Sequence, residues 1–478
     1  MNRAEPMIAL VAWLAVASTG CDDFLDVNEN PNAPESVRME LTLPGVLVAF
    51  NTDILASDYT NWGTEWTQQW SYNRDGRPYS VFQHYEMTSI DTDGFWSDAY
   101  ADVMQECQNM MAETAANEDW QYHGIAQFLF AWTATIVSDA FGPIPLSEAF
   151  DTGNPDPAYD SQQSVYQTAF QLIEEAIAEM QGPASSRVPG ANDLLFEGDM
   201  GRWVQLARTV QARLHMHVAS AQGENPQEHA QAALDALAGG LKSNADDAEF
   251  IFTGGEGARQ PLYQDADWDE EVVPSEFYVT LLQGLADPRL PITAQPTLLD
   301  GVYRGHRNGG LRAADSTISK LGTYFIGEDR SYTWMSFAEA KFIEAEARLI
   351  VGGPGAADGP YRDGIRANME KMGVAASDID AYLDAQAPLG ATDALERIIT
   401  QKYIANYLLI EAWVDWRRTG FPQIEPVPER LAIFDGIPQR LRTPASEISY
   451  NGANVGATGI PEGMAGMLVR VWWAGGSN

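Results

Sequence analysis

The sequence predicts a helical protein that carries long loops, and three observations lead to this prediction. Apolar residues recur every three or four positions in one segment after another, which is the spacing of one face of a helix. Residues 336–349 mix alanine with larger apolar residues, a pattern that suits stacked helical hairpins. Residues 250–315 are instead dominated by glycine, proline and acidic side chains, with aromatic residues dispersed among them, as in long loops with short helices.

The first expected helices lie in the N-terminal third of the chain. Folded structure is expected to begin with residues 39–50. Residues 95–110 have an apolar helical face that includes Cys107, which is therefore predicted to be a buried free thiol. Residues 124–137 form a further expected helix. A shaped loop must follow it, because a helix interior does not tolerate the residues Gly142, Pro143 and Pro145.

Two more amphipathic helices are expected at residues 159–180 and 199–219. In the first, either Asp160 or Ser161 can cap the helix N-terminus with its side-chain oxygen. In the second, one face is lined by Trp203, Leu206, Val210, Leu214 and Val218.

The C-terminal part predicts two long helices with a break between them. Ser336 followed three residues later by Glu339 is the capping-box arrangement, so a helix is expected from Ser336 to Leu349. Residues 352–359 form a break that is rich in glycine and proline, and residues 393–416 are expected to be the longest helix. Charge pairs between helix ends and the C-terminal loop are expected from Arg417, Arg418 and Arg440.

The N-terminus predicts an exported lipoprotein. Arg3 is followed by an apolar stretch of about a dozen residues, which suits a cleaved signal and is too short to span a bilayer. Small residues at 18–20 precede Cys21 and look like the lipobox of bacterial lipoproteins, with Ser18 where leucine is usual. We therefore expect a signal peptide at 1–20, lipidation of Cys21 and a flexible tether at 21–38. The alternative for Cys21 is a buried cysteine or a disulfide with Cys107.

Composition and charge limit the function. The chain has 478 residues, 45% of them hydrophobic, which is ample for a large core, and two cysteines leave no disulfide framework. Its 67 acidic and 29 basic side chains give a net charge of −38, which would repel a phosphate backbone, so nucleic acid is not an expected partner. No apolar run after the signal reaches the roughly eighteen residues of a spanning helix.

An aromatic segment follows the first expected helix. Trp62, Trp66 and Trp70 are four residues apart, so on one helix they would share a face. One interpretation is that this face belongs to the core. The other is that some of these rings, with the polar loop 71–80, form an exposed platform on which a ligand can stack.

An acidic stretch within the loop-rich segment resembles a calcium-binding loop. The residues at the required offsets are Asp265, Asp267, Asp269, Glu271 and Glu276. Glu270 stands where the sharp turn requires glycine, and Pro274 interrupts the pattern, so a solvated acidic loop is the alternative. No other cofactor is expected.

Nine segments together resemble the SusD/RagB family of outer-membrane nutrient-binding lipoproteins, and more closely its SusD-like second branch. The first five are CDDFLDVNENPNAP from Cys21, DAFGPIPLSEAF from Asp139, YDSQQSVY from Tyr159, GDMGRWVQLA from Gly198 and DPRL from Asp287. The others are FAEAKFIEAEA from Phe337, WVDWRRTGFP from Trp413, IPQRLRTPASE from Ile437 and VRVWW from Val469. They occur in family order from Cys21 almost to the end of the chain.

This resemblance implies an all-α fold, a tetratricopeptide-like scaffold of helical hairpins with long ligand-binding loops. No clean repeat of about 34 residues is visible in the sequence itself. The implied arrangement is a single domain at 39–478 with a loop-rich insertion at about 250–315. The implied role is to bind a nutrient oligomer and deliver it to a SusC-like TonB-dependent transporter. Asp22 and Asp23 after the lipidated cysteine are similar to the surface-export signal of such lipoproteins, which implies the outer membrane, facing the medium.

The candidate ligand-binding residues are aromatic and polar side chains in the variable loops. A sugar ring stacks its C–H face on aromatic rings while nearby polar groups bind its hydroxyls, although aromatic loops can equally bind peptide. The expected residues are Trp62, Trp66, Trp70, Tyr72, Asn73, Asp75, Tyr263, Trp268, Tyr303 and Arg304.

Two other classes of function compete with nutrient binding. An exported glycoside hydrolase would need a carboxylate pair, and none stands out. The sequence also lacks the common hydrolase, zinc-protease and phosphate-loop motifs, so no enzymatic activity is expected. A helical-repeat surface scaffold that binds only protein is the third possibility.

Overall fold

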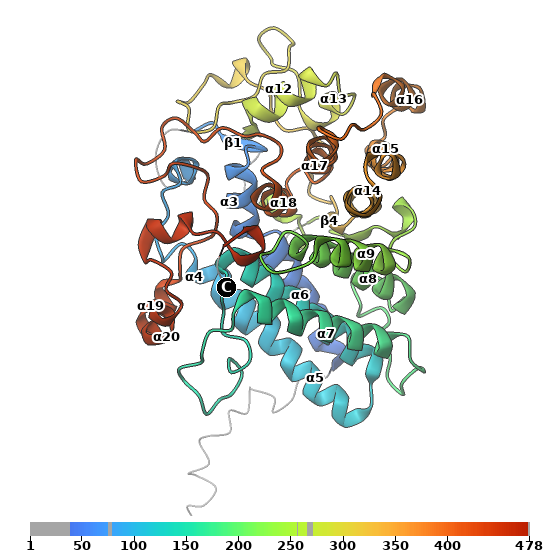
Figure 1. Ribbon diagram of the computed structural model, residues 1–478, viewed down its shortest axis with the longest axis vertical. Coiled ribbons are helices and arrows are strands. Elements are labelled where there is room, and N and C mark those ends of the chain that lie inside the picture. Colours follow the sequence, from blue (N-terminus) through green and yellow to red (C-terminus); the bar gives the residue numbers. More distant parts are fainter. Residues whose placement is uncertain (1–38, 75–78, 256, 265–270, 477–478) are drawn as a thin grey trace, which may run out of the picture.

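The computed structural model describes residues 39–74, 79–255, 257–264 and 271–476. Helices dominate this part of the chain, which confirms the predicted all-α class (Figure 1). The longer helices of the first half are α2 (Met39–Ala49), α3 (Asp58–Trp66), α5 (Gln105–Asn117), α6 (Trp120–Phe141), α7 (Gln162–Met180), α8 (Met200–Val218) and α9 (Pro226–Leu237). Those of the second half are α12 (Glu276–Gly284), α14 (Phe337–Gly352), α15 (Pro354–Lys371), α16 (Ala376–Ala385), α17 (Ala394–Ala405) and α18 (Glu411–Thr419).

Shorter helical elements connect the longer ones. Two π-helical segments, η1 (Phe50–Leu55) and η3 (Asp98–Met104), extend α2 and link α4 (Asp93–Ser97) to α5. The remaining short α-helices are α10 (Pro261–Gln264), α13 (Leu290–Thr293), α19 (Ala445–Tyr450) and α20 (Gly452–Ala457). The 3-10 helices are η2 (Tyr79–His84), η4 (Asn244–Asp246), η5 (Asp315–Thr317), η6 (Gly463–Leu468) and η7 (Trp472–Ala474).

The long helices stack on one another in chain order. α5 packs on α6, α6 on α7, α7 on α8 and α8 on α9, and α14 then packs against α9, α15 and α17. The close approach of α6 and α7 requires a glycine, because a Cβ at Gly124 would lie 2.8 Å from the carbonyl oxygen of Ala176. These successive helical pairs form the rigid body of the protein.

α6 is the centre of this body. Its length and composition would allow it to cross a membrane, and no other helix of the described ranges meets that test. Its most apolar window is entirely buried, which identifies α6 as a core helix. Cys107 on the neighbouring α5 is fully buried, as predicted, and it forms no disulfide within the part of the chain that the structure describes.

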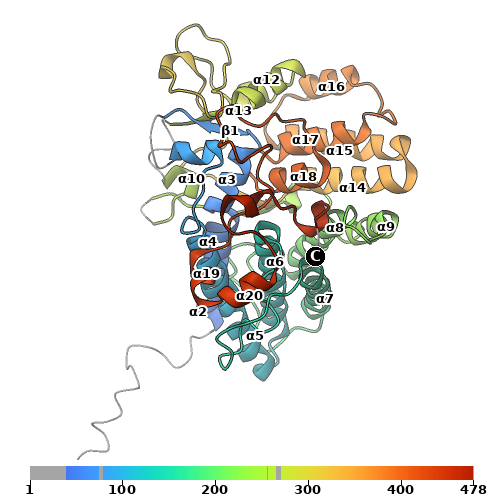
Figure 2. The ribbon, with the colours of Figure 1, turned by 60° about the vertical axis from the view of Figure 1, so that its left-hand side comes forward.

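The sequence between α9 and α14 departs from the helical stack and contains β2, β3 and β4, whereas β1 follows α3; none of these strands was predicted from the sequence. β1 (Trp70–Tyr72) pairs antiparallel with β3 (Val272–Pro274), and β2 (Ala248–Phe250) pairs antiparallel with β4 (Tyr332–Met335). Figure 2 shows β1, α12 and the loops around them at one end of the molecule, beside the stacked pairs α14 to α17.

The prediction of one long helix at 393–416 is wrong, because the structure divides this range into α17 and α18. Leu408 has a positive φ of 64°, and the side chain of Gln69 enters the gap between the two helices. Gln69 donates to the carbonyl oxygens of Tyr403 and Asn406, both at 3.1 Å, and accepts from the amide of Leu408 at 2.7 Å. A side chain more than 300 positions away therefore replaces helical hydrogen bonds.

A buried cluster of charged side chains joins the helical pairs. Lys402 lies 2.9 Å from Asp415 and 3.1 Å from Glu411, and Arg213 binds Glu339 through two nitrogens at 2.8 and 2.7 Å. Arg418 contacts Glu346 and Asp415, which confirms its expected role as a charge partner.

The other two arginines of that prediction bind differently. Arg417 donates to the carbonyl oxygens of Asp139 and Gln439, so it joins α6 to the C-terminal loop through backbone groups. Arg440 is buried against Gly142 and forms no ion pair with the residues that the structure describes, so the expectation is wrong for Arg440. Burial lowers the pKa of Arg440 to about 9.

Candidate functional site

The β1–β3 ribbon brings the predicted ligand-binding residues Tyr72 and Asn73 beside Glu271, at the end of the predicted calcium loop. Trp70 lies opposite Pro274 and Tyr72 opposite Val272, so the chain that leaves β1 and the chain that enters β3 lie at the same end of the ribbon. At this end the amide of Asn73 donates to the carbonyl oxygen of Glu271 at 2.8 Å. Arg74 forms an ion pair with Glu271 at 2.7 Å.

A third segment, which contains His306 and Asn308, is hydrogen-bonded to the ribbon. The amide of His306 donates to Pro274, and its ring nitrogen Nδ1 lies 2.8 Å from the hydroxyl of Ser71. Asn308 donates to the carbonyl oxygen of Trp70 at 2.7 Å.

Gly305 and Asn73 complete this attachment. A Cβ at Gly305 would lie 2.1 Å from the carbonyl oxygen of Ser275, so only glycine allows the approach of the two backbones. Asn73 donates to the carbonyl oxygen of Ala313 at 3.0 Å and accepts from its amide at 2.7 Å. We call residues 71–74, 271–275 and 303–315 the loop face.

The four expected ligand-binding rings that precede Asn73 are buried, so the exposed-platform interpretation is wrong for them. Trp62, Trp66, Trp70 and Tyr72 are at most 5% exposed. They also do not share a helix, because α3 ends at Trp66 and Trp70 begins β1. The indole of Trp66 donates to the carbonyl oxygen of Phe82 at 3.0 Å. The structure agrees with the alternative interpretation, in which these rings belong to the hydrophobic core.

The later candidates differ in exposure. Asn73 is 1% exposed and holds the loop face together by the hydrogen bonds described above, so it acts as a structural residue in this arrangement. Tyr303 is half-buried and packs on the core, whereas Arg304 is exposed and pairs with Asp300 at 3.0 Å. Tyr263 in α10 is 38% exposed. Asp75 and Trp268 lie outside the described residues.

The three aspartates of the calcium-loop prediction, Asp265, Asp267 and Asp269, also lie outside the described residues. Of the two glutamates that completed the pattern, Glu271 is paired with Arg74 and Glu276 is the first residue of α12. In the ranges that the structure describes, no group of three or more acidic, histidine or cysteine side chains is arranged to hold a metal ion.

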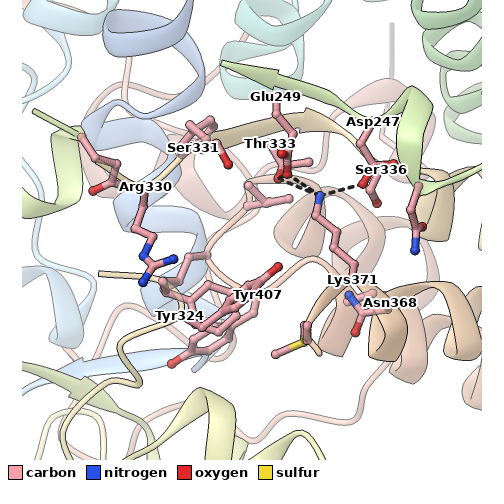
Figure 3. A pocket seen from close by; sticks show the side chains of 18 residues that line it. Asp247, Glu249, Tyr324, Arg330, Ser331, Thr333, Ser336, Asn368, Lys371 and Tyr407 are labelled. Carbon is pink, nitrogen blue, oxygen red and sulfur yellow. Dashed lines mark hydrogen bonds and ion pairs between the residues drawn. The ribbon is translucent and has the colours of Figure 1, made fainter. Parts of the chain in front are cut away.

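A cavity of about 270 Å³ lies where the chain between α9 and α14 meets the helical stack (Figure 3). Its walls come from β2 and β4, from the C-terminal end of α15, and from the turn between α17 and α18. Lys371 projects into it and contacts Asp247 at 2.7 Å, Glu249 at 2.8 Å and the hydroxyl of Thr333 at 3.2 Å. We call this the Lys371 cavity.

The electrostatics of the Lys371 cavity follow from burial and from these contacts. Burial alone would lower the pKa of Lys371, but Asp247 and Glu249 raise it above its ordinary value, so the amine is charged. Burial raises the pKa of Asp247, and Lys371 opposes that rise. Burial also raises the pKa of Tyr324, which faces the same charges.

Sequence reasoning missed the Lys371 cavity. Asp247 directly precedes β2 and Glu249 lies within it, and this spacing of two residues is visible in the sequence. Lys371 and Tyr324 come from distant segments, and no local pattern connects them with the two acids.

The fold and the loop face define a class of protein, a stack of helical pairs that carries long loops at one end. A family model described as "Starch-binding associating with outer membrane", the SusD-like second branch, matches residues 31–444. The chain belongs to this family, whose members have the tetratricopeptide-like helical architecture expected from the sequence.

Solved structures show the same fold. A SusD/RagB family protein from Bacteroides thetaiotaomicron matches with a TM-score of 0.80 at 20% identity, over 93% of this chain and 100% of that one. A chitin-binding SusD homologue from Flavobacterium johnsoniae matches with a TM-score of 0.78 at 22% identity, over 91% and 98%. A protein named as chitin-binding gives a TM-score of 0.76 at 23% identity, over 91% and 100%. No curated protein matches the chain in sequence.

Proposed function

We propose that this protein binds a glycan at the cell surface and delivers it to a SusC-like TonB-dependent transporter without cleaving it. The observation that carries the proposal is the convergence of three loop segments on the β1–β3 ribbon, two of them predicted from the sequence to bind ligand. The family description and the chitin-binding names of two structural relatives support a glycan over a peptide.

The proposed ligand site is the loop face and the segment that leads to β3. Among its described residues, Tyr263 offers an exposed aromatic ring for stacking. Arg304 offers an exposed guanidinium as a hydrogen-bond donor, which an ion pair with Asp300 holds in position. From the sequence, Trp268 and Asp75 remain proposed ligand contacts.

The partner and the location are part of the same proposal. Leu298, Leu299, Val302 and Leu311 are between 44% and 87% exposed on one loop segment, and exposed apolar side chains of this kind support a protein partner. We propose that a lipid on Cys21 holds the protein on the outer membrane, facing the medium. Radiolabelled palmitate should mark the wild-type chain but not a Cys21→Ala variant, and labelling of both would contradict the anchor.

Binding of oligosaccharides tests the glycan part of the proposal. Calorimetry with chitin and starch oligosaccharides should detect binding of at least one, and chromatography of the mixture should show no shorter products. Tyr263→Ala and Trp268→Ala should each weaken binding about tenfold.

The matched control is Tyr450→Ala, because Tyr450 is 82% exposed on α19 and lies outside the loop face. It should leave the affinity unchanged. Preferential binding of a peptide would contradict the glycan assignment, and release of shorter sugars would identify a hydrolase.

A further inference from the structure

We propose that the Lys371 cavity is a second binding site, separate from the loop face, which takes a single neutral sugar unit. This inference rests on the proposed function, because both concern glycan binding, but it concerns different residues. The loop face lies on the β1–β3 ribbon, whereas the cavity lies against the β2–β4 ribbon and the end of α15.

The polar side of the cavity is organised to accept hydrogen bonds. An ammonium group has three protons, and the contacts of Lys371 with Asp247, Glu249 and Thr333 use all three. Lys371 therefore fixes the two carboxylates, whose remaining lone pairs can accept from a ligand. Asn244 also lines the cavity, and its buried side-chain oxygen accepts no hydrogen bond from the described residues. Such an atom needs a donor, and a sugar hydroxyl supplies one.

The aromatic side of the cavity offers ring surfaces. Tyr324 is half-buried and makes an edge contact with Phe325 at 4.9 Å between ring centroids, and Phe325 contacts Tyr407 at 5.0 Å. Figure 3 shows the rings of Tyr324 and Tyr407 across the cavity from Glu249 and Asp247. A sugar ring has an apolar C–H face and a polar rim, which matches two walls of this kind.

Charge and volume narrow the ligand class. The lining contains two carboxylates, Asp247 and Glu249, and two cations, Lys371 and Arg330, so it carries no net charge and favours a ligand without net charge. The volume of about 270 Å³ lies just below the range of about 300–1,000 Å³ for small-molecule sites, which suits one sugar ring rather than an oligomer.

Met372 provides a reporter for this site, because its side chain lines the cavity and is 8% exposed. The mature chain would be labelled with ¹³C in its methionine methyl groups, and the Met372 signal assigned with Met372→Leu. Titration with glucose and with N-acetylglucosamine should shift this signal saturably. Tyr324→Ala should weaken that binding about tenfold, and Glu249→Gln, which keeps the shape of the side chain, should weaken it severalfold.

Tyr450→Ala is the matched control, because Tyr450 is 82% exposed on α19 and does not line the cavity, and it should leave the monosaccharide affinity of the cavity unchanged. If oligosaccharides bind but neither monosaccharide shifts Met372, the inference is overturned while the proposed function stands. If glycylglycine shifts Met372 at lower concentration than the sugars, the sugar assignment is overturned. If neither oligosaccharide nor monosaccharide binds, both proposals fail.

Discussion

Lys402→Met tests whether the buried charged cluster stabilises the helical stack. Lys402 is 1% exposed and lies within 3.6 Å of three carboxylates, those of Asp415, Glu411 and Glu339. Methionine keeps most of the volume and removes the charge, which leaves buried carboxylates without this partner. Removing one member of a buried ion pair typically costs about 3–5 kcal/mol, so we expect the free energy of unfolding to fall by that amount at pH 7.

The loss of stability in Lys402→Met should depend on pH in a defined direction. Burial alone would raise the pKa of Glu411, but Lys402, His217 and Arg213 hold it well below its ordinary value of 4.5. A carboxylate with a depressed folded-state pKa stabilises the fold above the unfolded pKa, and this contribution is lost progressively as the pH falls from there through the folded-state pKa. The difference between wild type and Lys402→Met should therefore be largest near pH 7 and narrow below about pH 4.5.

The assay is urea unfolding followed by tryptophan fluorescence at pH 7 and pH 4. The matched control is Lys341→Met, because Lys341 is 24% exposed and pairs with Glu344 at the surface of α14. Exposed pairs contribute about 0–1 kcal/mol, so this variant should unfold almost as wild type does. A Lys402→Met variant within about 1 kcal/mol of wild type at pH 7 would refute the reasoning, because the desolvation cost of the cluster would then cancel its attraction.

Three further variants test other features of the structure. Burial and the neighbouring His229 lower the pKa of His215 from 6.5 to about 4, so stability should fall as the pH drops through this window because the unfolded chain binds the proton. Over that pH range, the free energy of unfolding of His215→Gln should fall by up to about 3 kcal/mol less than that of the wild type. Parallel pH profiles of the two proteins would contradict the assignment. Gly305→Ala should lower the free energy of unfolding by about 1–3 kcal/mol, because the added Cβ would collide with Ser275. It should also speed amide hydrogen exchange at residues 303–308, and unchanged exchange would argue against the attachment of this segment to the ribbon. Trp66→Ala should cost about 3–5 kcal/mol in thermal or urea unfolding, and full stability would contradict its place in the core.

Some features depended on short stretches of sequence, and these could be predicted. Ser161 caps α7 by accepting from the amide of Ser164, as one of the two predicted alternatives. Ser336 caps α14 by accepting from the amide of Glu339, although the carboxylate of Glu339 binds Arg213 instead of completing the capping box. Helix spacing and caps involve residues three or four positions apart, so the sequence contains the whole interaction.

The candidate site could be predicted only in part. The sequence identified the segments that meet on the loop face, but it placed Trp62, Trp66 and Trp70 on one helix and left their exposure open. Helical periodicity shows which residues share a face, but not whether another part of the chain covers that face. In the structure, Trp413 from α18 packs against Trp66, with ring centroids 5.3 Å apart.

By itself the sequence determined the helical class, most helix positions, the buried thiol and the family. Tertiary structure decided where α17 ends, which loops meet on the ribbon and that a cavity forms around Lys371. Each of these depends on contacts between residues far apart in the chain, such as Gln69 with Leu408 and Asp247 with Lys371. Local patterns do not encode such contacts, because their geometry exists only after the helices have packed.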